Sequence, residues 1–188
     1  MSELESFIPP LKAIVKSAGE AILKVYHASG EIEVQNKADD SPVTKADHAA
    51  HLIIEEGLQA LTIQYPILSE EGGLPDYSLR KHWQRYWLVD PLDGTKEFIN
   101  KNGEFTVNIA LIENDRPILG IVYVPVTGVL YYGIHHEAEQ ISLAFKESEA
   151  QGKHAISVST PAFDKELVIV GSRRHGAEAL DALLKKIE

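Results

Sequence analysis

The stretch from Trp87 to Phe98 constrains the fold of this chain more than any other. Its apolar start, up to Val89, predicts a short buried strand, and Asp90 and Asp93 follow at once with a proline between them. Two carboxylates at the tip of a strand suit a hard cation such as Mg²⁺, which prefers oxygen ligands. We therefore expect the fold to present this tip to a site for a cation.

Backbone groups of the same stretch add to the expected site. The carbonyl of Leu92 would supply a further oxygen, and Gly94 lets the backbone approach a ligand closely. If a helix starts there, the N–H groups of Gly94 and Thr95 would face an anion. Turn chemistry alone also explains Asp-Pro-Leu-Asp-Gly, because these residue types are common in tight turns. The five-residue motif by itself leaves both interpretations open.

The composition disfavours several classes of protein. A net charge of −10 argues against a nucleic-acid polymer as partner, and it would repel a phosphorylated ligand unless cations intervene. Without cysteines the chain has neither a disulfide framework nor thiolate metal ligands. The sequence shows no signal-peptide pattern and no apolar run that is long enough to span a bilayer, so we expect a cytoplasmic protein.

Hydrophobic periodicity predicts an N-terminal helical part and then a β-rich part. One amphipathic helix is expected from the first-turn prolines Pro9 and Pro10 to Gly30, and a second begins near Asp47. Residues 72–82 are interpreted as a loop and residues 177–187 as a helix. The expected strands span residues 31–37, 63–69, 87–89, 105–112, 118–124, 129–134, 141–145 and 168–170. Their short spacing after Phe98 predicts an antiparallel meander.

Acidic residues outside the central stretch are further candidates. Thr44 and Asp47 fit the Ser/Thr-x-x-Asp/Glu pattern of a capping box, which is the ordinary role of such a pair. Glu70 and Glu71 precede two glycines, as in a solvated turn. They also follow an apolar run, so a second strand would deliver acids at its C-terminal end.

Three segments carry basic or aromatic groups. Residues 82–86 are interpreted as a packed entry into the central strand rather than a platform for a base. His135 and His136 are expected to be exposed in a turn, where neighbouring side chains diverge and a metal role is disfavoured. The segment Gly171–Gly176 either cradles an anion or is a plain strand-to-helix turn.

The longer string Asp90–Thr95 resembles the Asp-Pro-(Ile/Leu)-Asp-Gly-Thr signature of the inositol monophosphatase family of metal-dependent phosphatases. The continuation Lys96-Glu97-Phe98 is similar to the 3′(2′),5′-bisphosphate nucleotidase branch, and the resemblance covers about residues 10–176. It implies an α/β (α+β) fold in layers, with paired helices packed on a mostly antiparallel sheet. The implied domains are residues 1–155 and the start of a second α/β domain at 156–188. Because the family's Trp-Asp-x-Ala-Ala-Gly motif is missing, we expect this second domain to be incomplete.

The resemblance also implies roles for individual residues. Two or more Mg²⁺ ions would be held by Glu70, Asp90, Asp93 and the carbonyl of Leu92. Asp47 and Thr95 would form the catalytic pair that activates the attacking water. The implied substrate-binding residues are Glu70, Leu92, Asp93, Gly94, Thr95, Ser172, Arg173 and His175.

The implied reaction removes the 3′-phosphate of 3′-phosphoadenosine 5′-phosphate to give AMP and phosphate, with a role in sulfur assimilation and inhibition by Li⁺. The implied partner is a small phosphorylated nucleotide. A homodimer stays open, as does the peripheral inner-membrane association implied for bacterial-type members. Two alternatives remain, namely an inositol monophosphatase with the same metal core and a metal-binding fragment without activity.

Overall fold

A computed structural model describes residues 2–29, 33–36, 42–136, 141–158, 180, 184 and 185. The chain divides into two compact units, Met1–Ser157 and Val158–Glu188, and the elements described below all lie in the first. The strand expected at 168–170, the segment Gly171–Gly176 and most of the helix expected at 177–187 lie outside the described residues. The expected domain boundary at residue 155 stays a prediction.

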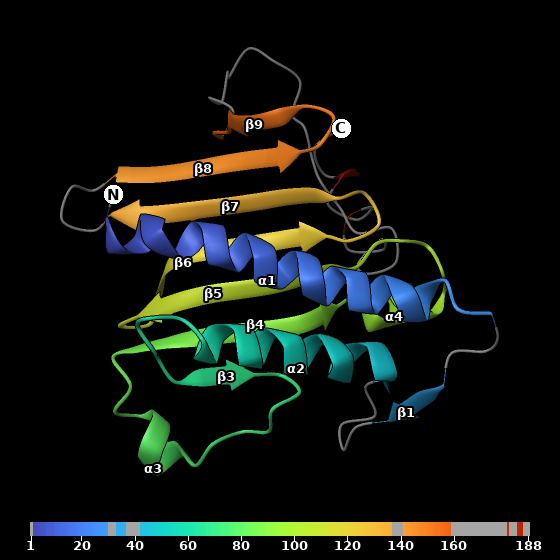
Figure 1. Ribbon diagram of the computed structural model, residues 1–188, viewed down its shortest axis with the longest axis horizontal. Coiled ribbons are helices and arrows are strands. Elements are labelled where there is room, and N and C mark those ends of the chain that lie inside the picture. The colour runs from blue at the N-terminus through green and yellow to red at the C-terminus, as the bar shows by residue number, and fades with distance from the viewer. Residues whose placement is uncertain are drawn as a thin grey trace. The chain divides into compact units, whose positions relative to one another are not determined.

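The first unit consists of a helical layer, a small hairpin and one large sheet (Figure 1). In chain order the elements are α1 (Glu3–Tyr26), β1 (Val34–Asn36), β2 (Pro42–Thr44), α2 (Lys45–Gln59), β3 (Ile67–Ser69), α3 (Tyr77–Arg80), β4 (Arg85–Asp93), α4 (Thr95–Ile99), β5 (Thr106–Glu113), β6 (Arg116–Val124), β7 (Val129–His136), β8 (Ile141–Ser148) and β9 (Gly152–Ala155). No helix within the described ranges has both the length and the apolar character of a membrane span.

The first helix begins before its prolines. The hydroxyl of Ser2 accepts a hydrogen bond from the N–H of Glu5, and the Glu5 carboxylate accepts one from the N–H of Ser2. This capping box starts α1 at Glu3, so the expectation that Pro9 and Pro10 occupy its first turn is wrong. Both prolines lie inside the helix, where each removes one backbone hydrogen bond. The buried apolar face of α1 offsets that loss.

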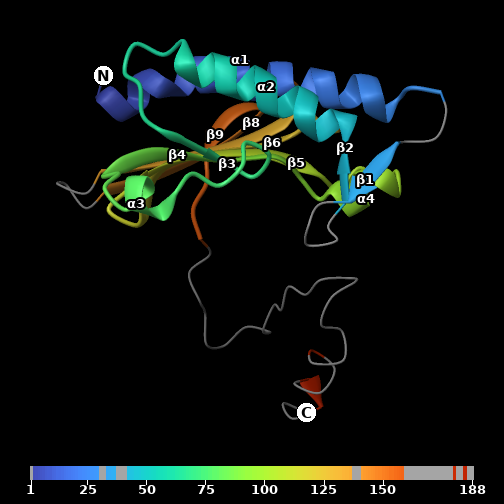
Figure 2. The ribbon, with the colours of Figure 1, turned by 90° about the horizontal axis from the view of Figure 1, so that it is seen from below.

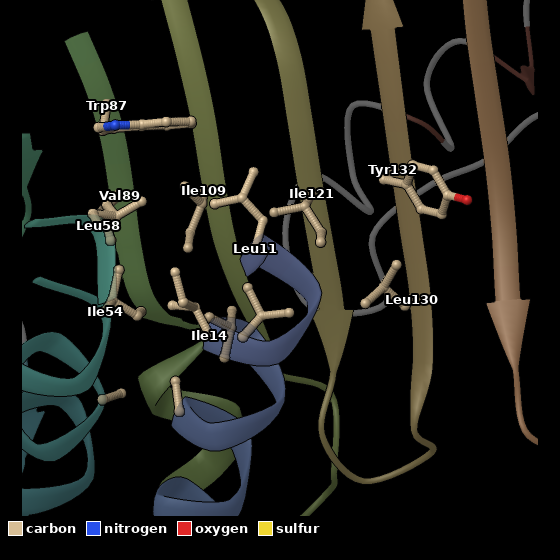
Figure 3. Packing of buried hydrophobic residues seen from close by; sticks show 14 of the residues in the cluster. Leu11, Ile14, Ile54, Leu58, Trp87, Val89, Ile109, Ile121, Leu130 and Tyr132 are labelled. Atoms are coloured by element: carbon tan, nitrogen blue, oxygen red, sulfur yellow. The ribbon is translucent and has the colours of Figure 1, made fainter. Parts of the chain in front are cut away.

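Helices α1 and α2 pack side by side over one face of the large sheet (Figure 2). Gly57 permits their close approach, because a Cβ at that position would lie 2.6 Å from Cγ1 of Ile14. Under the helices, buried side chains from α1, α2 and strands β4 to β7 form one cluster. Figure 3 labels ten of them, Leu11, Ile14, Ile54, Leu58, Trp87, Val89, Ile109, Ile121, Leu130 and Tyr132.

The large sheet has the order β3-β4-β5-β6-β7-β8-β9. Strand β3 runs parallel to β4, and every other neighbouring pair is antiparallel. The predicted fold, with paired helices on a mostly antiparallel sheet, is therefore confirmed. The parallel edge strand sets the ends of β3 and β4 next to each other.

Several expected boundaries are wrong for local reasons. Strand β3 is shorter than the expected 63–69. Of the expected strand 31–37, residues 34–36 form β1, while residues 31, 32 and 37 lie outside the described residues. The expected loop at 72–82 contains α3, capped by Asp76, whose carboxylate accepts the N–H of Ser78. His135 and His136 lie in β7 rather than in a turn, because pairing with β8 continues to their positions. Strand β9 was not predicted, because its exposed residues lack the apolar pattern of a strand.

The sheet face that points away from α1 and α2 carries exposed apolar side chains. Leu88 and Val122 lie on it, since they alternate with residues buried under the helices. A cavity of about 620 Å³ runs along β3 to β6 on this side. Its lining includes Glu70, Asp90 and Asn108, which form part of the candidate site.

Candidate functional site

Two parallel strands bring the first pair of acids together. Ser69, the last residue of β3, lies opposite Val89 of β4. The next N–H, that of Glu70, donates to the carbonyl of Val89 at 3.1 Å. This bond continues the register by one residue, so Glu70 lies beside Asp90. Acids from two separate segments thus meet at one end of the sheet.

A bulge in β4 adds Asp93 to this pair. Asp90 pairs with Asn108 of β5, whereas Asp93 pairs with Thr106, so β4 carries one extra residue between these pairs. In a regular strand, side chains three positions apart point to opposite faces, and the extra residue re-aims Asp93. Nδ2 of Asn108 donates to Oδ2 of Asp93 at 3.1 Å. The Asp93 carboxylate therefore lies beside the cross-strand partner of Asp90.

The bulge also explains why β4 continues past Val89, the end expected from the sequence. Pro91 lacks an N–H and would interrupt a regular ladder, but it lies in the bulge, where pairing is interrupted in any case. The strand, which begins at Arg85, therefore continues to Asp93.

The surroundings of Asp90 disfavour the charged form of its carboxyl group. Its pKa is raised to about 7, most of all by burial, and also by the negative charges of Glu70 and Asp93 and a hydrogen bond to Glu70. Its Oδ1 is buried and has no hydrogen-bond partner among the described residues. A buried carboxylate in this state favours either a proton or a bound cation.

The oxygens around Asp90 fit a divalent cation in chemical type. Glu70 and Asp93 are exposed toward solvent, and the Leu92 carbonyl lies 3.3 Å from the hydroxyl of Thr95. Within the described ranges, no three side chains of His, Cys, Asp or Glu converge as a preformed metal cage. Glu70 and Asp90 share a hydrogen bond instead. A cation would replace that proton, and water would complete a shell of the kind that Mg²⁺ keeps.

Asp47 makes both of the contacts that its two candidate roles require. Its Oδ2 accepts the N–H of Thr44 at 2.8 Å and the Thr44 hydroxyl at 2.6 Å, which completes the capping box of α2. Its Oδ1 lies 3.1 Å from the hydroxyl of Thr95 and accepts that proton. The side chain is 1% exposed, so capping fixes the carboxylate that Thr95 contacts. The predicted pair Asp47 and Thr95 is in contact, while its catalytic role stays a prediction.

Gly94 is required where β4 turns into α4. Its φ is +93°, in the left-handed region that favours glycine. A Cβ there would also lie 2.9 Å from the carbonyl oxygen of Glu104. Only glycine therefore connects Asp93 to Thr95 without strain in this geometry.

Ser172, Arg173 and His175 lie outside the described residues, so their predicted role in substrate binding stays untested. Two residues at the site were missed. Asn108 is a polar residue between Val107 and Ile109 in β5, and this break in the apolar pattern was a usable signal. His51 lies four residues after Asp47 on α2, and only the fold shows what it contacts.

Comparison with known proteins agrees with this geometry. The pattern of the inositol monophosphatase family matches residues 3–184, and the chain therefore belongs to that family. Members of the family are phosphatases that depend on divalent metal ions.

Three relatives show which members of the family this chain resembles. The 3′(2′),5′-bisphosphate nucleotidase CysQ of Salmonella typhimurium is 58% identical over 125 residues, which are 66% of this chain and 50% of that protein. The same-named protein of Buchnera aphidicola is 43% identical over 175 residues, 93% of this chain and 62% of the relative. The crystal structure of CysQ from Bacteroides thetaiotaomicron superposes with a TM-score of 0.73 at 35% identity, covering 96% of this chain and 69% of that one.

The predicted resemblance to the bisphosphate nucleotidase branch of this family is confirmed. The chain spans about half the length of the Salmonella protein.

Proposed function

We propose that this chain carries the metal-binding half of a divalent-metal-dependent phosphate monoester hydrolase. The observation that carries the proposal is the meeting of Glu70, Asp90 and Asp93 at the end of β4, one short turn from the Asp47–Thr95 pair. Hard oxygen ligands next to a polarised hydroxyl suit the hydrolysis of a phosphate ester, because phosphate and Mg²⁺ bind each other strongly.

Each residue has a role in the proposed mechanism. Glu70, Asp90, Asp93 and the Leu92 carbonyl would hold two or more Mg²⁺ ions, which when bound polarise the phosphate and lower the pKa of water. Thr95 donates its proton to Asp47. The Thr95 oxygen would accept a hydrogen bond and then the proton from the attacking water, while the hydroxyl proton of Thr95 passes to Asp47.

The start of α4 has a second role in this mechanism. The N–H groups of Gly94 and Thr95 would stabilise charge that develops on the phosphoryl oxygens. The chain needs no covalent intermediate for this reaction, because an oriented water serves as the nucleophile.

The proposed substrate is 3′-phosphoadenosine 5′-phosphate, hydrolysed to AMP and phosphate. Its support is that curated relatives at 58% and 43% identity carry the name of that activity. Inositol monophosphate is the second candidate, because the family pattern itself carries that name. Inhibition by Li⁺, a homodimer, a cytoplasmic location and inner-membrane association stay predictions from the sequence.

A comparison of two substrates tests the proposal. Phosphate release is measured with Mg²⁺ from 3′-phosphoadenosine 5′-phosphate and from inositol 1-phosphate, for the unsubstituted chain and for Asp93→Asn. We expect faster release from the nucleotide and a loss of release in the variant. Near-equal turnover by Asp93→Asn would overturn the metal assignment. Mg²⁺ binding by calorimetry without turnover of either substrate would identify a metal-binding chain without activity.

A further inference from the structure

Helix α2 contacts both halves of the candidate site through one face. Asp47 and His51 are four residues apart, so their side chains lie on the same side, about 6 Å apart along the axis. Asp47 bonds Thr95 after the tip of β4. Nδ1 of His51 lies 2.9 Å from the hydroxyl of Ser69, the residue that directly precedes Glu70 at the tip of β3.

The contact between His51 and Ser69 is largely buried, and neighbouring groups surround the imidazole. The side chain of His51 is 12% exposed, and Ser69 is 6% exposed. Nε2 of His51 lies 3.7 Å from the carboxylate of Glu55, one further turn along the same face. A Cβ on Gly72 would lie 3.2 Å from Cε1 of His51, so the turn that follows Glu70 packs directly against the imidazole.

Three contacts together fix the backbone around Glu70. Its N–H donates to the carbonyl of Val89 at 3.1 Å, and the N–H of Gly72 closes the turn onto the carbonyl of Ser69 at 3.2 Å. His51 supplies the third contact, through the Ser69 side chain. An apolar side chain in place of His51 would fill the space but would leave the buried Ser69 hydroxyl without this partner.

We propose that His51 is a positioning residue for Glu70, and that α2 sets the tip of β3 against the tip of β4 through His51 and Asp47. The catalytic consequence rests on the proposed function, whereas the positioning of the turn does not. His51 itself bonds Ser69 and acts on the site only through the turn. Its removal should therefore loosen the turn that carries Glu70 and weaken cation binding without removing a ligand.

The test compares three variants of the full chain with the unsubstituted protein. His51→Ala removes the hydrogen bond, and His51→Asn keeps a polar nitrogen or oxygen near the position of Nδ1. His48→Ala is the matched control, because His48 is exposed on the same helix. Amide hydrogen exchange is measured at residues 69–72, and Mn²⁺ affinity by calorimetry.

We expect His51→Ala to exchange faster at residues 69–72 and to bind Mn²⁺ roughly tenfold more weakly, as when an outer hydrogen-bond partner of a metal ligand is lost. His51→Asn should recover most of both effects, and His48→Ala should change neither. With a hydrolysed substrate, kcat should fall more than KM rises. Unchanged exchange and Mn²⁺ affinity in His51→Ala, or no recovery in His51→Asn, would overturn the proposal.

Two further outcomes, a His51→Ala variant that does not fold and a chain without phosphatase activity, can also be interpreted. If His51→Ala does not fold, His51→Asn and Ser69→Ala decide, since Ser69→Ala should loosen the turn and His51→Asn should not. The opposite order would overturn the proposal. If the unsubstituted chain releases no phosphate but exchange still responds to His51→Ala, the proposed function fails while the positioning role stands.

Discussion

Replacing Asp90 by Asn should stabilise the metal-free protein at neutral and alkaline pH. Asp90 is buried next to Glu70 and Asp93, and its pKa is raised to about 7 from an ordinary 3.8. The folded protein therefore binds more protons than the unfolded chain between about pH 4 and pH 7, and stability falls as the pH rises through this window. Above pH 7 the loss is complete. Asn keeps the shape of the side chain and removes the titration.

The size of the effect follows from the same shift. About three pH units at roughly 1.4 kcal/mol each give an upper bound of about 4 kcal/mol. Because Asp90 is only partly shielded from solvent, screening reduces this to roughly 2 kcal/mol. For a chain of this size, that corresponds to about 4–8 °C in Tm.

The assay is urea denaturation of both proteins in EDTA at pH 4 and pH 8. The gain of Asp90→Asn over the unsubstituted protein should be larger at pH 8 by roughly 2 kcal/mol. Adding Mg²⁺ at a hundredfold excess over its Kd should stabilise the unsubstituted protein by about 2.7 kcal/mol and reverse the order. A variant that is no more stable at pH 8 in EDTA, or that gains equally from Mg²⁺, would refute the reasoning.

Three further substitutions test other parts of the site. Thr95→Val should lower phosphate release by about 10²–10⁴-fold while urea denaturation shifts by about 1 kcal/mol, because the hydroxyl acts in proton transfer; equal losses in Asp93→Asn and Thr95→Val at unchanged Mg²⁺ affinity would contradict these separate roles. Gly94→Ala should cost roughly 1–3 kcal/mol in urea denaturation and more than the control Gly128→Ala, since both have positive φ but only Gly94 meets a neighbouring carbonyl. Asn108→Ala should weaken Mg²⁺ binding in calorimetry by roughly tenfold, because the Asp93 carboxylate loses its hydrogen-bond partner; unchanged affinity would show that Asn108 does not orient it.

The layered fold was predictable because the sequence patterns are strong. Two amphipathic helices and a series of β runs between turn residues define an α/β arrangement, and the meander from β5 to β8 follows the predicted runs closely. The start of α1 was readable as well, since Ser2 and Glu5 form a capping-box pattern. Pro9 and Pro10 instead favour a later start, because prolines are common in first turns.

The assembly of the site was only partly predictable. The sequence predicts that Asp90 and Asp93 lie near a strand tip. In a regular strand, however, side chains three residues apart would point to opposite faces of the sheet. The bulge that re-aims Asp93 depends on pairing with β5, which the local sequence does not encode. The contact between Glu70 and Asp90 likewise depends on a parallel register between distant segments.

Asp47 shows why two interpretations of one pattern can both hold. The capping pattern with Thr44 is local and was visible in the sequence, whereas the contact with Thr95 arises from tertiary structure. The carboxylate has two oxygens, and each makes one of these contacts. The substrate-binding role of Ser172, Arg173 and His175 stays a prediction from the sequence alone.

Anomalous diffraction from crystals soaked in Mn²⁺ tests the central claim most directly. The carboxylates of Glu70, Asp90 and Asp93 should surround a peak with metal–oxygen distances of about 2.1 Å, the value for a small divalent cation. Absence of a peak there, or a peak bound by acids elsewhere on the chain, would contradict the account.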